Sequence, residues 1–257
     1  MMPMKFGLMV IGDEILSGRR RDTHVDWFRK ILQEYGFSLG WVQILPDDPE
    51  LLVRQLKQSM AAGERVFSCG GIGATPDDHT RQCAAKAADV PLVRHPEAAA
   101  LIEKQFPHSA RPHRIRMADL PEGSRLIPNP VNNVPGFSIN QHYFMPGFPD
   151  MSHPMGQWVL RRYYEPDTHP EQELSLRVYG ASENELMPIL EKMSRDWPQL
   201  KLFSLPRMGE ASFVELGFVG SEGVEEAFQA LKEELLQAKF SFVVSPLSES
   251  SGNADRS

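Results

Sequence analysis

The sequence predicts an α/β protein: a first domain with a largely parallel mixed sheet covered by helices, followed by a small α+β domain. In the first third, short apolar runs alternate with amphipathic stretches, a pattern typical of parallel strands joined by helices. The character of the sequence then changes after a polar segment with two prolines at residues 165–171, the best candidate for a linker. The 257 residues suffice for a domain of about 150 residues and a smaller one.

The first predicted strand covers residues 6–11. A helix follows from about Thr23, with Asp22 as its cap and Gly36 as its C-terminal stop. Its apolar side chains share one helical face, which favours packing against a core over ligand contact. These elements form the first β-α unit.

Two further strands complete the β-α-β-α-β-α run. The second strand covers residues 37–45, and Asp47-Asp48-Pro49-Glu50 begins the second helix, which ends before Gly63. The third strand, residues 66–69, leads into the most informative segment of the chain, residues 70–80.

Residues 70–80 read Gly-Gly-Ile-Gly-Ala-Thr-Pro-Asp-Asp-His-Thr. The glycines let backbone N–H groups approach a ligand closely. Thr75 and Asp78 match a capping box with Pro76 in the first helical position, so a helix is expected to begin where the glycines end. Asp77 and Asp78 would repel a bare phosphate, which indicates a phosphate bound together with Mg²⁺ or a similar hard cation. An ordinary well-capped helix is the alternative interpretation.

Polar turns follow all three of the first strands. Gly12-Asp13-Glu14, Pro46-Asp47-Asp48 and the glycine loop each stand at the carboxyl end of a predicted strand. Ligands of open α/β sheets bind beyond those ends. The convergence favours a ligand site over three unrelated acidic turns.

Residues 91–150 are richer in proline and loops. A helix is expected near residues 96–106, and a strand near residues 143–145 leads through Pro146 and Gly147 into a helix that ends at about Tyr164. A basic cluster lies between them, most simply read as solvated surface, with a ligand phosphate as the less favoured partner. Its members are Arg111, His113, Arg114 and Arg116.

The second module reads as strand, helix, two strands, helix and strand. Its strands are expected at residues 173–179, 201–205, 211–219 and 240–244, and its helices at 183–195 and 223–237. The proposed domain boundaries are therefore 1–165 and 171–245. Residues 246–257 are expected to be disordered.

Composition narrows the functional classes. A formal net charge of −7 argues against nucleic acid as the main partner, because such proteins usually carry a basic surplus. No stretch approaches 18 uninterrupted apolar residues, so no membrane span is expected. Two cysteines are too few for a disulfide framework and favour the cytoplasm, with Cys69 more simply a buried strand residue than a reactive thiol. The N-terminus reads as a first strand and not as a signal peptide.

Two motifs in this order carry a family resemblance. Residues 10–18 (Val-Ile-Gly-Asp-Glu-Ile-Leu-Ser-Gly) with Asp22-Thr23, together with residues 70–80, resemble the N-terminal domain of CinA-type proteins. That domain belongs to the molybdopterin-binding family of MogA, MoaB and gephyrin. The resemblance covers residues 5–164, and residues 173–237 look like the small domain that follows in CinA-type proteins. The nicotinamide-nucleotide deamidase domain of longer relatives has no counterpart in the sequence, so that activity is not expected.

The resemblance implies a three-layer α/β/α sandwich, a homodimer, and a glycine loop that holds a phosphorylated pterin or nucleotide. It places the metal-binding and catalytic role on Asp47 and Asp78, with Asp77 assisting. Asp13 and Glu14 would hold a sugar hydroxyl or a water. The substrate-binding residues expected on these grounds are Gly12, Asp13, Glu14, Ser17, Gly18, Gly70, Gly71, Gly73, Thr75, Asn129, Gly136, Pro146 and Gly147.

Two chemistries follow from the resemblance, and both act on a phosphoanhydride. The CinA branch implies hydrolysis of the pyrophosphate in ADP-ribose with Mg²⁺, Mn²⁺ or Co²⁺, which is the leading hypothesis. The molybdopterin branch implies a molybdopterin-binding protein or an adenylyltransferase. A sensor that binds a nucleotide without turnover is the third interpretation.

The sequence departs from the family pattern in ways that indicate a subgroup with its own substrate. Asn132 replaces a usual glycine and Val134 a usual alanine, either of which would narrow a pocket wall. Ala74 stands in place of a usual proline, and His24 and His79 in place of an asparagine and an apolar residue. Each of these histidines is more simply a partly exposed surface residue than a metal ligand.

Overall fold

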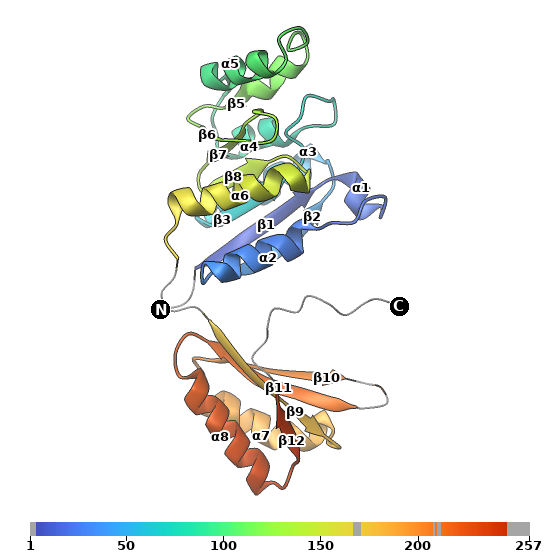
Figure 1. Ribbon diagram of the computed structural model, residues 1–257, viewed down its shortest axis with the longest axis vertical. Coiled ribbons are helices and arrows are strands. Elements are labelled where there is room, and N and C mark those ends of the chain that lie inside the picture. Colours follow the sequence, from blue (N-terminus) through green and yellow to red (C-terminus); the bar gives the residue numbers. More distant parts are fainter. Residues whose placement is uncertain (1–3, 167–170, 208, 210–211, 246–257) are drawn as a thin grey trace. The chain divides into compact units, whose positions relative to one another are not determined.

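The computed structural model describes residues 4–166, 171–207, 209 and 212–245, and the chain divides into two compact units (Figure 1). One unit covers Met4–Pro166, and the described part of the other covers residues 171–207, 209 and 212–245. The predicted disordered tail, residues 246–257, lies outside the described residues, as does most of the predicted linker.

A six-stranded sheet forms the centre of the first unit, in the order β2-β1-β3-β8-β7-β6 (Figure 1). Its strands are β1 (Lys5–Ile11), β2 (Ser38–Leu45), β3 (Arg65–Cys69), β6 (Arg125–Ile127), β7 (Gly136–Ile139) and β8 (His142–Met145). Strands β2, β1, β3 and β8 are parallel, whereas β7 is antiparallel to both of its neighbours. The carboxyl ends of four adjacent strands therefore meet at one edge of the sheet.

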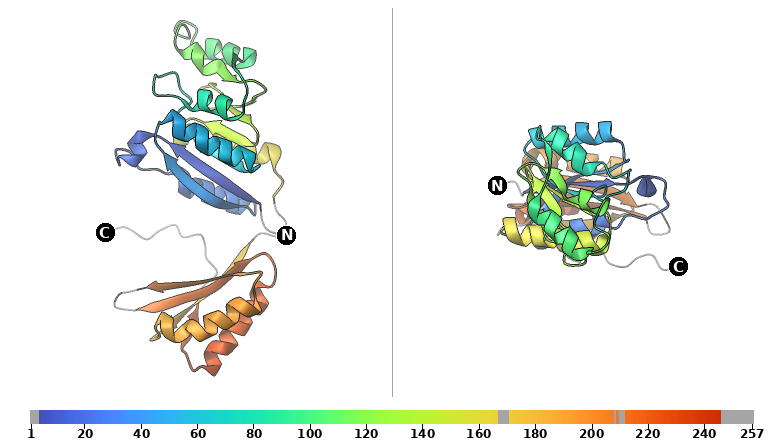
Figure 2. Two further views of the ribbon diagram at one scale, coloured as in Figure 1. Left: turned by 180° about the vertical axis from the view of Figure 1, so that it is seen from behind. Right: turned by 90° about the horizontal axis from the view of Figure 1, so that it is seen from above.

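Helices cover both faces of this sheet. Helices α2 (His24–Glu34) and α6 (Pro149–Tyr163) share a buried core with Phe6, Leu8 and Val10 of β1. Helices α3 (Pro49–Ala61) and α4 (Thr80–Ala87) share the opposite core with Met9 and Ile11. Figure 2 shows α3 in front of the sheet, on the side away from α2 and α6. The mixed α/β fold predicted from the sequence is confirmed.

Local sequence explains why several predicted boundaries agree closely with the structure. The Asp48 carboxylate accepts the N–H groups of Glu50 and Leu51 and so caps α3, with Pro49 as its first residue. Gly36, at φ 75°, occupies the left-handed conformation after α2 that ends the helix. Pairing with β1 begins at Ser38.

Short elements account for most of what the pattern did not predict. They are α1 (Asp13–Leu16), a two-stranded sheet of β4 (Leu92–Arg94) and β5 (Asp119–Pro121), and the 3-10 helix η1 (Arg114–Ala118). The predicted helix near residues 96–106 is α5 (Pro96–Gln105). Together, α5, η1 and β5 extend the core on the α3–α4 face, where Ile102, Ile115 and Leu120 are buried.

The second unit is an antiparallel sheet with two helices on one face. Its elements are β9 (Gln172–Tyr179), α7 (Glu183–Asp196), β10 (Lys201–Arg207), β11 (Phe213–Gly220), α8 (Val224–Gln237) and β12 (Phe242–Val244). The strand order is β10-β11-β9-β12. Leu190 of α7 and Leu231 of α8 belong to one buried core with Leu216 of β11. This is an α+β module of its own.

Candidate ligand-binding pocket

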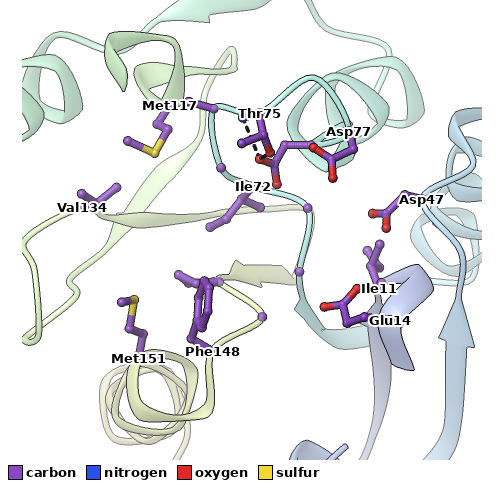
Figure 3. Close-up of a pocket in the computed structure, with 18 of the residues that line it drawn as sticks. Ile11, Glu14, Asp47, Ile72, Thr75, Asp77, Met117, Val134, Phe148 and Met151 are labelled. Carbon is purple, nitrogen blue, oxygen red and sulfur yellow. Dashed lines mark hydrogen bonds between the residues drawn. The ribbon is translucent and has the colours of Figure 1, made fainter. Parts of the chain in front are cut away.

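A pocket of about 470 Å³ lies at the edge of the first unit where the parallel strands end (Figure 3). Its walls come from the segments after β1, β2, β3 and β8, completed by residues of the α5–η1 region and of the 129–134 loop. The residues that line it are Ile11, Gly12, Glu14, Arg20, Asp47, Gly70, Gly71, Ile72, Gly73, Ala74, Thr75, Asp77, Asp78, Phe106, Met117, Asn129, Asn132, Val134, Pro146, Gly147, Phe148 and Met151. The predicted convergence of three strand ends is what the structure shows.

The glycine loop is tied to the start of α4. Thr80 donates its hydroxyl to the Gly70 carbonyl at 3.0 Å, and its N–H to the Gly71 carbonyl at 3.0 Å. Gly71 has φ 68°, and a Cβ there would lie 2.2 Å from the Thr80 hydroxyl oxygen. A Cβ at Gly73 would lie 2.4 Å from an Asp78 carboxylate oxygen. Gly71 therefore requires glycine by conformation as well as by space, whereas at Gly73 a side chain would have to displace the Asp78 carboxylate.

The helix does not begin where the sequence predicts it. Helix α4 begins at Thr80 with His79 in the N-cap position, four residues after the expected cap Thr75. The Asp78 carboxylate instead accepts both the N–H of Thr75, at 2.9 Å, and its hydroxyl, at 2.5 Å. The capping-box prediction is wrong, because the same carboxylate-to-backbone bond closes a tight turn here.

Arg81 supports the loop from behind. Its guanidinium donates to the Gly73 carbonyl at 2.7 Å and to the carbonyls of Arg116 and Asp119, while the side chain is only 3% exposed. Burial lowers its pKa, an effect that the charges of Asp78 and Asp119 oppose. A single buried arginine thus connects the glycine loop to the segment that carries Met117.

The acidic side of the pocket consists of Glu14, Asp47 and Asp77. The Asp13 N–H donates to the Asp47 carboxylate at 3.1 Å, which joins the turns after β1 and β2. Burial raises the pKa of Asp47, and the negative charges of Asp13, Glu14 and Asp77 raise it further, whereas the Asp13 N–H lowers it. Figure 3 shows Asp77 and Asp47 on the same side of the pocket as Glu14. This side would bind a cation favourably.

The apolar side of the pocket lies opposite. Figure 3 shows Met117, Val134, Phe148 and Met151 there, with Ile72 between the two sides. Together with Phe106 these side chains give an apolar surface of the kind that binds ring systems. The apolar side is defined by Ile72, Phe106, Met117, Val134, Phe148 and Met151.

Asparagine side chains hold the 129–134 loop against this surface. Asn129 donates its amide to the Asn132 side-chain oxygen at 2.8 Å, and the Val134 N–H donates to the same oxygen at 3.0 Å. The Asn132 side chain thus holds the loop in shape through its oxygen.

Most of the expected site residues, both catalytic and substrate-binding, lie at the pocket. Those that line it are Gly12, Glu14, Asp47, Gly70, Gly71, Gly73, Thr75, Asp77, Asp78, Asn129, Pro146 and Gly147.

Four of the expected residues do not line the pocket. Asp13 contributes its N–H to Asp47, and Ser17 accepts from the Arg19 side chain at 3.0 Å. Gly18, at φ 72°, belongs to the turn after α1. Gly136 is buried in β7, where a Cβ would lie 2.3 Å from the Phe144 carbonyl oxygen. Close packing of β7 against β8 therefore explains that glycine.

The pattern missed eight lining residues: Ile11, Arg20, Ile72, Ala74, Phe106, Met117, Phe148 and Met151. Ile11 and Ile72 adjoin predicted strand ends, so the strand-end rule could have found them. In contrast, no member of the basic cluster lines the pocket. Arg111 pairs with Glu103 at 2.8 Å, and Arg114 lies over the Phe106 ring.

A chain of buried hydrogen bonds lies behind the pocket. His24 Nδ1 is 2.8 Å from Asp22 Oδ1, and His24 Nε2 is 3.1 Å from the Ser152 hydroxyl. Although the order Asp-His-Ser matches a catalytic triad, Ser152 is fully buried and cannot meet a substrate. His24 is 3% exposed, so the expectation of a partly exposed histidine is wrong for this position. The chain joins the start of α2 to the start of α6.

Several other expectations can be compared with the structure. Cys69 and Cys83 are free and buried, and burial raises the pKa of both thiols, as expected for core cysteines. Among the described residues, no group of three or more His, Cys, Asp or Glu side chains could hold a metal ion by itself. Within the same residues, no helix is long and apolar enough to cross a membrane.

Three comparisons connect the chain to known proteins. The family model "probable molybdopterin binding domain" matches residues 7–165. A CinA-like protein of Geobacter sp. (strain M21) is 33% identical over 196 residues, which are 73% of this chain and 47% of that protein. A protein of Pyrobaculum calidifontis is 28% identical over 256 residues, 91% of this chain and 96% of that one. The chain thus spans about half the length of the Geobacter relative.

A solved structure shares the fold of the first unit. The crystal structure of the protein CinA from Thermoplasma acidophilum matches with a TM-score of 0.57 at 26% identity. The match covers 62% of this chain and 99% of that one.

Proposed function

Because this chain belongs to the probable molybdopterin binding domain family, as a CinA-type member, we propose that its pocket binds a phosphorylated nucleotide and hydrolyses its pyrophosphate with a divalent cation. ADP-ribose represents the proposed substrate class. One observation carries the proposal: the glycine loop and the acidic side border the same pocket, beyond the ends of parallel strands.

A divalent cation fits the acidic side only when the ligand shares in binding it. No described group of three ligating side chains exists, but Mg²⁺ commonly uses one or two carboxylates together with substrate phosphates and water. Asp47 and Asp77 would supply those carboxylates, since the negative charge of Asp77 contributes to the raised pKa of Asp47 and a cation between them would relieve that repulsion. When bound, the cation supplies charge neutralisation for the phosphoanhydride.

Asp78 has a different role in this proposal from the one that the resemblance implies. One of its oxygens already accepts two hydrogen bonds from Thr75, and the same oxygen lies against Gly73. Asp78 therefore holds the glycine loop in shape. Asp77, which the resemblance treats as an assistant, becomes the second cation ligand.

The chain's own residues would bind and orient the ligand from two directions. Backbone N–H groups of the glycine loop are suited to phosphate oxygens, because neither Gly71 nor Gly73 carries a side chain of its own that would cover them. The apolar side would take the base, which orients the pyrophosphate toward Asp47 and Asp77.

Product analysis tests the proposal directly. Purified protein with Mg²⁺, Mn²⁺ or Co²⁺ should convert ADP-ribose to AMP and ribose phosphate, and added chelator should stop the reaction. If none of these metals supports cleavage of ADP-ribose or related dinucleotides, hydrolysis is excluded.

A second candidate function is molybdopterin binding, alone or with adenylyl transfer. The family match and the apolar side, which is suited to a fused ring, favour it. Titration with molybdopterin and ATP separates the two, because a hydrolase should form no adenylylated pterin. Tight nucleotide binding with no product over hours would identify a sensor instead.

The proposal extends to assembly and location. We propose a cytoplasmic homodimer, on the basis of the family resemblance and the two reduced cysteines. Sedimentation at several protein concentrations would show a single species of twice the 29.0 kDa chain mass.

A further inference from the structure

Arg20 and Phe148 are neighbouring residues in the pocket wall, and both side chains are partly exposed. Arg20 is the only lysine, arginine or histidine among the described residues that line the pocket. Its guanidinium carbon lies 5.1 Å from the centre of the Phe148 ring, a cation–π arrangement. Phe148 is 52% exposed, which is unusual for so large an apolar side chain. A charged group and an aromatic ring thus lie in contact in a partly exposed part of the pocket wall.

The backbone of Arg20 is fixed, whereas its charge is only weakly paired. Its N–H donates to the Glu14 carbonyl at 3.0 Å, which closes the turn between residues 14 and 20. Arg20 Nη1 lies 3.8 Å from Glu14 Oε1, beyond hydrogen-bond length. Both side chains are about half exposed, at 45% and 44%, so their attraction is largely screened. An anion that binds Arg20 more strongly could therefore replace Glu14 as the partner of its guanidinium with little loss of interaction energy.

The charges of the pocket show which anion that would be. Glu14, Asp47, Asp77 and Asp78 are all acidic, so a phosphate in this pocket needs positive charge from elsewhere. A divalent cation that is shared between the carboxylates of the acidic side and the ligand leaves part of the charge of the ligand's phosphates unneutralised. Arg20 is the lining side chain that can neutralise the rest, and its planar fork suits phosphate oxygens.

We propose that Arg20 and Phe148 form an anion clamp, in which Arg20 exchanges Glu14 for a phosphate oxygen of the bound ligand and stays stacked on Phe148. This inference rests on the proposed function, because it requires a phosphorylated ligand in the pocket. Arg20 is then a specificity residue: it selects phosphorylated ligands over the same base without phosphate.

Calorimetric titration of two ligands that differ only in phosphate tests the clamp. AMP and adenosine would each be titrated in Mg²⁺ into wild type, Arg20→Gln and Arg20→Lys. Arg20→Gln should weaken AMP binding about tenfold, or about 1.4 kcal/mol, and leave adenosine binding unchanged. Arg20→Lys keeps the charge but loses the planar fork, so its AMP affinity should lie between the other two.

Arg19→Gln is the matched control. Arg19 is the neighbouring arginine, donates to Ser17 at 3.0 Å and does not line the pocket, so this variant should bind AMP as wild type does. The clamp is overturned if Arg20→Gln binds AMP as tightly as wild type, or if it loses adenosine binding equally. If wild type binds neither AMP nor ADP-ribose, the proposed function itself fails, which is a separate result. Thermal melting of each variant would confirm that it is folded.

Discussion

The acidic side and the apolar side of the pocket differ in how they are built. The acidic side comes from the segments that follow β1, β2 and β3, and the hydrogen bond from the Asp13 N–H to the Asp47 carboxylate joins the first two. The apolar side comes partly from segments away from these strand ends: Phe106 follows α5, Met117 lies in η1, and Met151 lies in α6, whereas Ile72 and Phe148 follow β3 and β8. The sheet positions the groups suited to phosphate chemistry, whereas the groups suited to ring recognition depend also on how the α5–η1 region and α6 pack. Substitutions on the acidic side should therefore affect hydrolysis, whereas substitutions on the apolar side should affect nucleotide affinity.

Removal of one carboxylate from the acidic side should have the largest effect. Asp47→Asn keeps the acceptor for the Asp13 N–H but removes the charge that would hold a cation. We expect the rate of ADP-ribose hydrolysis to fall about a thousandfold, which corresponds to a loss of several kcal/mol in transition-state stabilisation. Product formation measured by chromatography checks this.

Asp26→Asn is the matched control for that variant, because Asp26 is an exposed aspartate on α2 that pairs with Arg29 at 2.9 Å. It should hydrolyse ADP-ribose at the wild-type rate. Equal activity of Asp47→Asn and wild type would remove the assignment of the cation to the acidic side.

Arg81 connects the two sides, so its removal should loosen both. Arg81→Met fills similar space but removes the guanidinium donor from the carbonyls of Gly73, Arg116 and Asp119, of which the Arg116 carbonyl keeps the Asp119 N–H. Because each unsatisfied buried group costs about 1–3 kcal/mol, we expect a loss of roughly 2–4 kcal/mol in the free energy of unfolding. Urea denaturation measures it.

Arg116→Gln is the matched control for Arg81→Met. Arg116 is exposed, and it is the backbone carbonyl of Arg116 that accepts from Arg81, so the substitution leaves that acceptor in place. This variant should unfold within about 0.5 kcal/mol of wild type. An unchanged midpoint for Arg81→Met would show that the guanidinium does not support the loop.

A truncation on the apolar side should reduce affinity without affecting phosphate recognition. Met117→Ala removes a half-buried side chain from the pocket wall, so nucleotide affinity should fall about tenfold. Binding of inorganic pyrophosphate with Mg²⁺ should stay unchanged. Met187→Ala, at an exposed position of α7, is the control. Equal losses for nucleotide and pyrophosphate would contradict the division into two sides.

The smallest expected effect is on pH dependence. Because the folded-state pKa of Asp47 lies above its ordinary value of 3.8, the ionised form is the less favourable one in the folded protein. Protonated Asp47 therefore stabilises the folded protein fully below pH 3.8, and this contribution is lost as pH rises through the raised pKa of Asp47. Asp47→Asn should therefore gain a few tenths of a kcal/mol relative to wild type from pH 3.8 to neutrality.

Addition of Mg²⁺ with AMP should remove that advantage of Asp47→Asn, because the bound cation stabilises the ionised form in wild type. Thermal melting across pH, with and without the two ligands, measures both effects. A gain that is the same at pH 3.8 and pH 7 would show that ionisation is not its cause.

The sequence predicted the elements with clear punctuation and missed those without it. Asp48-Pro49 and Gly36 mark helix ends by chemistry that acts within a few residues, so α2 and α3 agree with expectation. Strands β4 and β5 have three residues each, too few for a period of two to be seen. The Thr75–Asp78 motif misled because one hydrogen bond closes a turn as well as it caps a helix.

The residues of the candidate site also divide into those that the sequence predicted and those that it missed. Asp47 and Gly71 were found because strand ends in parallel sheets have one common edge. Phe106 and Met117 follow no such rule, and at helical spacing they look like ordinary core residues. Arg20 stands between two further arginines in an exposed turn, so the pattern alone does not distinguish it from solvated charge.

The hydrogen bond from the Asp13 N–H to Asp47 has a thermodynamic consequence. It joins the carboxylate that would hold a cation to the turn that carries Glu14 and Arg20. A cation that shifts Asp47 must therefore alter the free energy of that turn, and by reciprocity an anion on Arg20 must alter cation affinity by the same factor. We expect metal and nucleotide to bind with positive cooperativity, each saturating at lower concentration when the other is present.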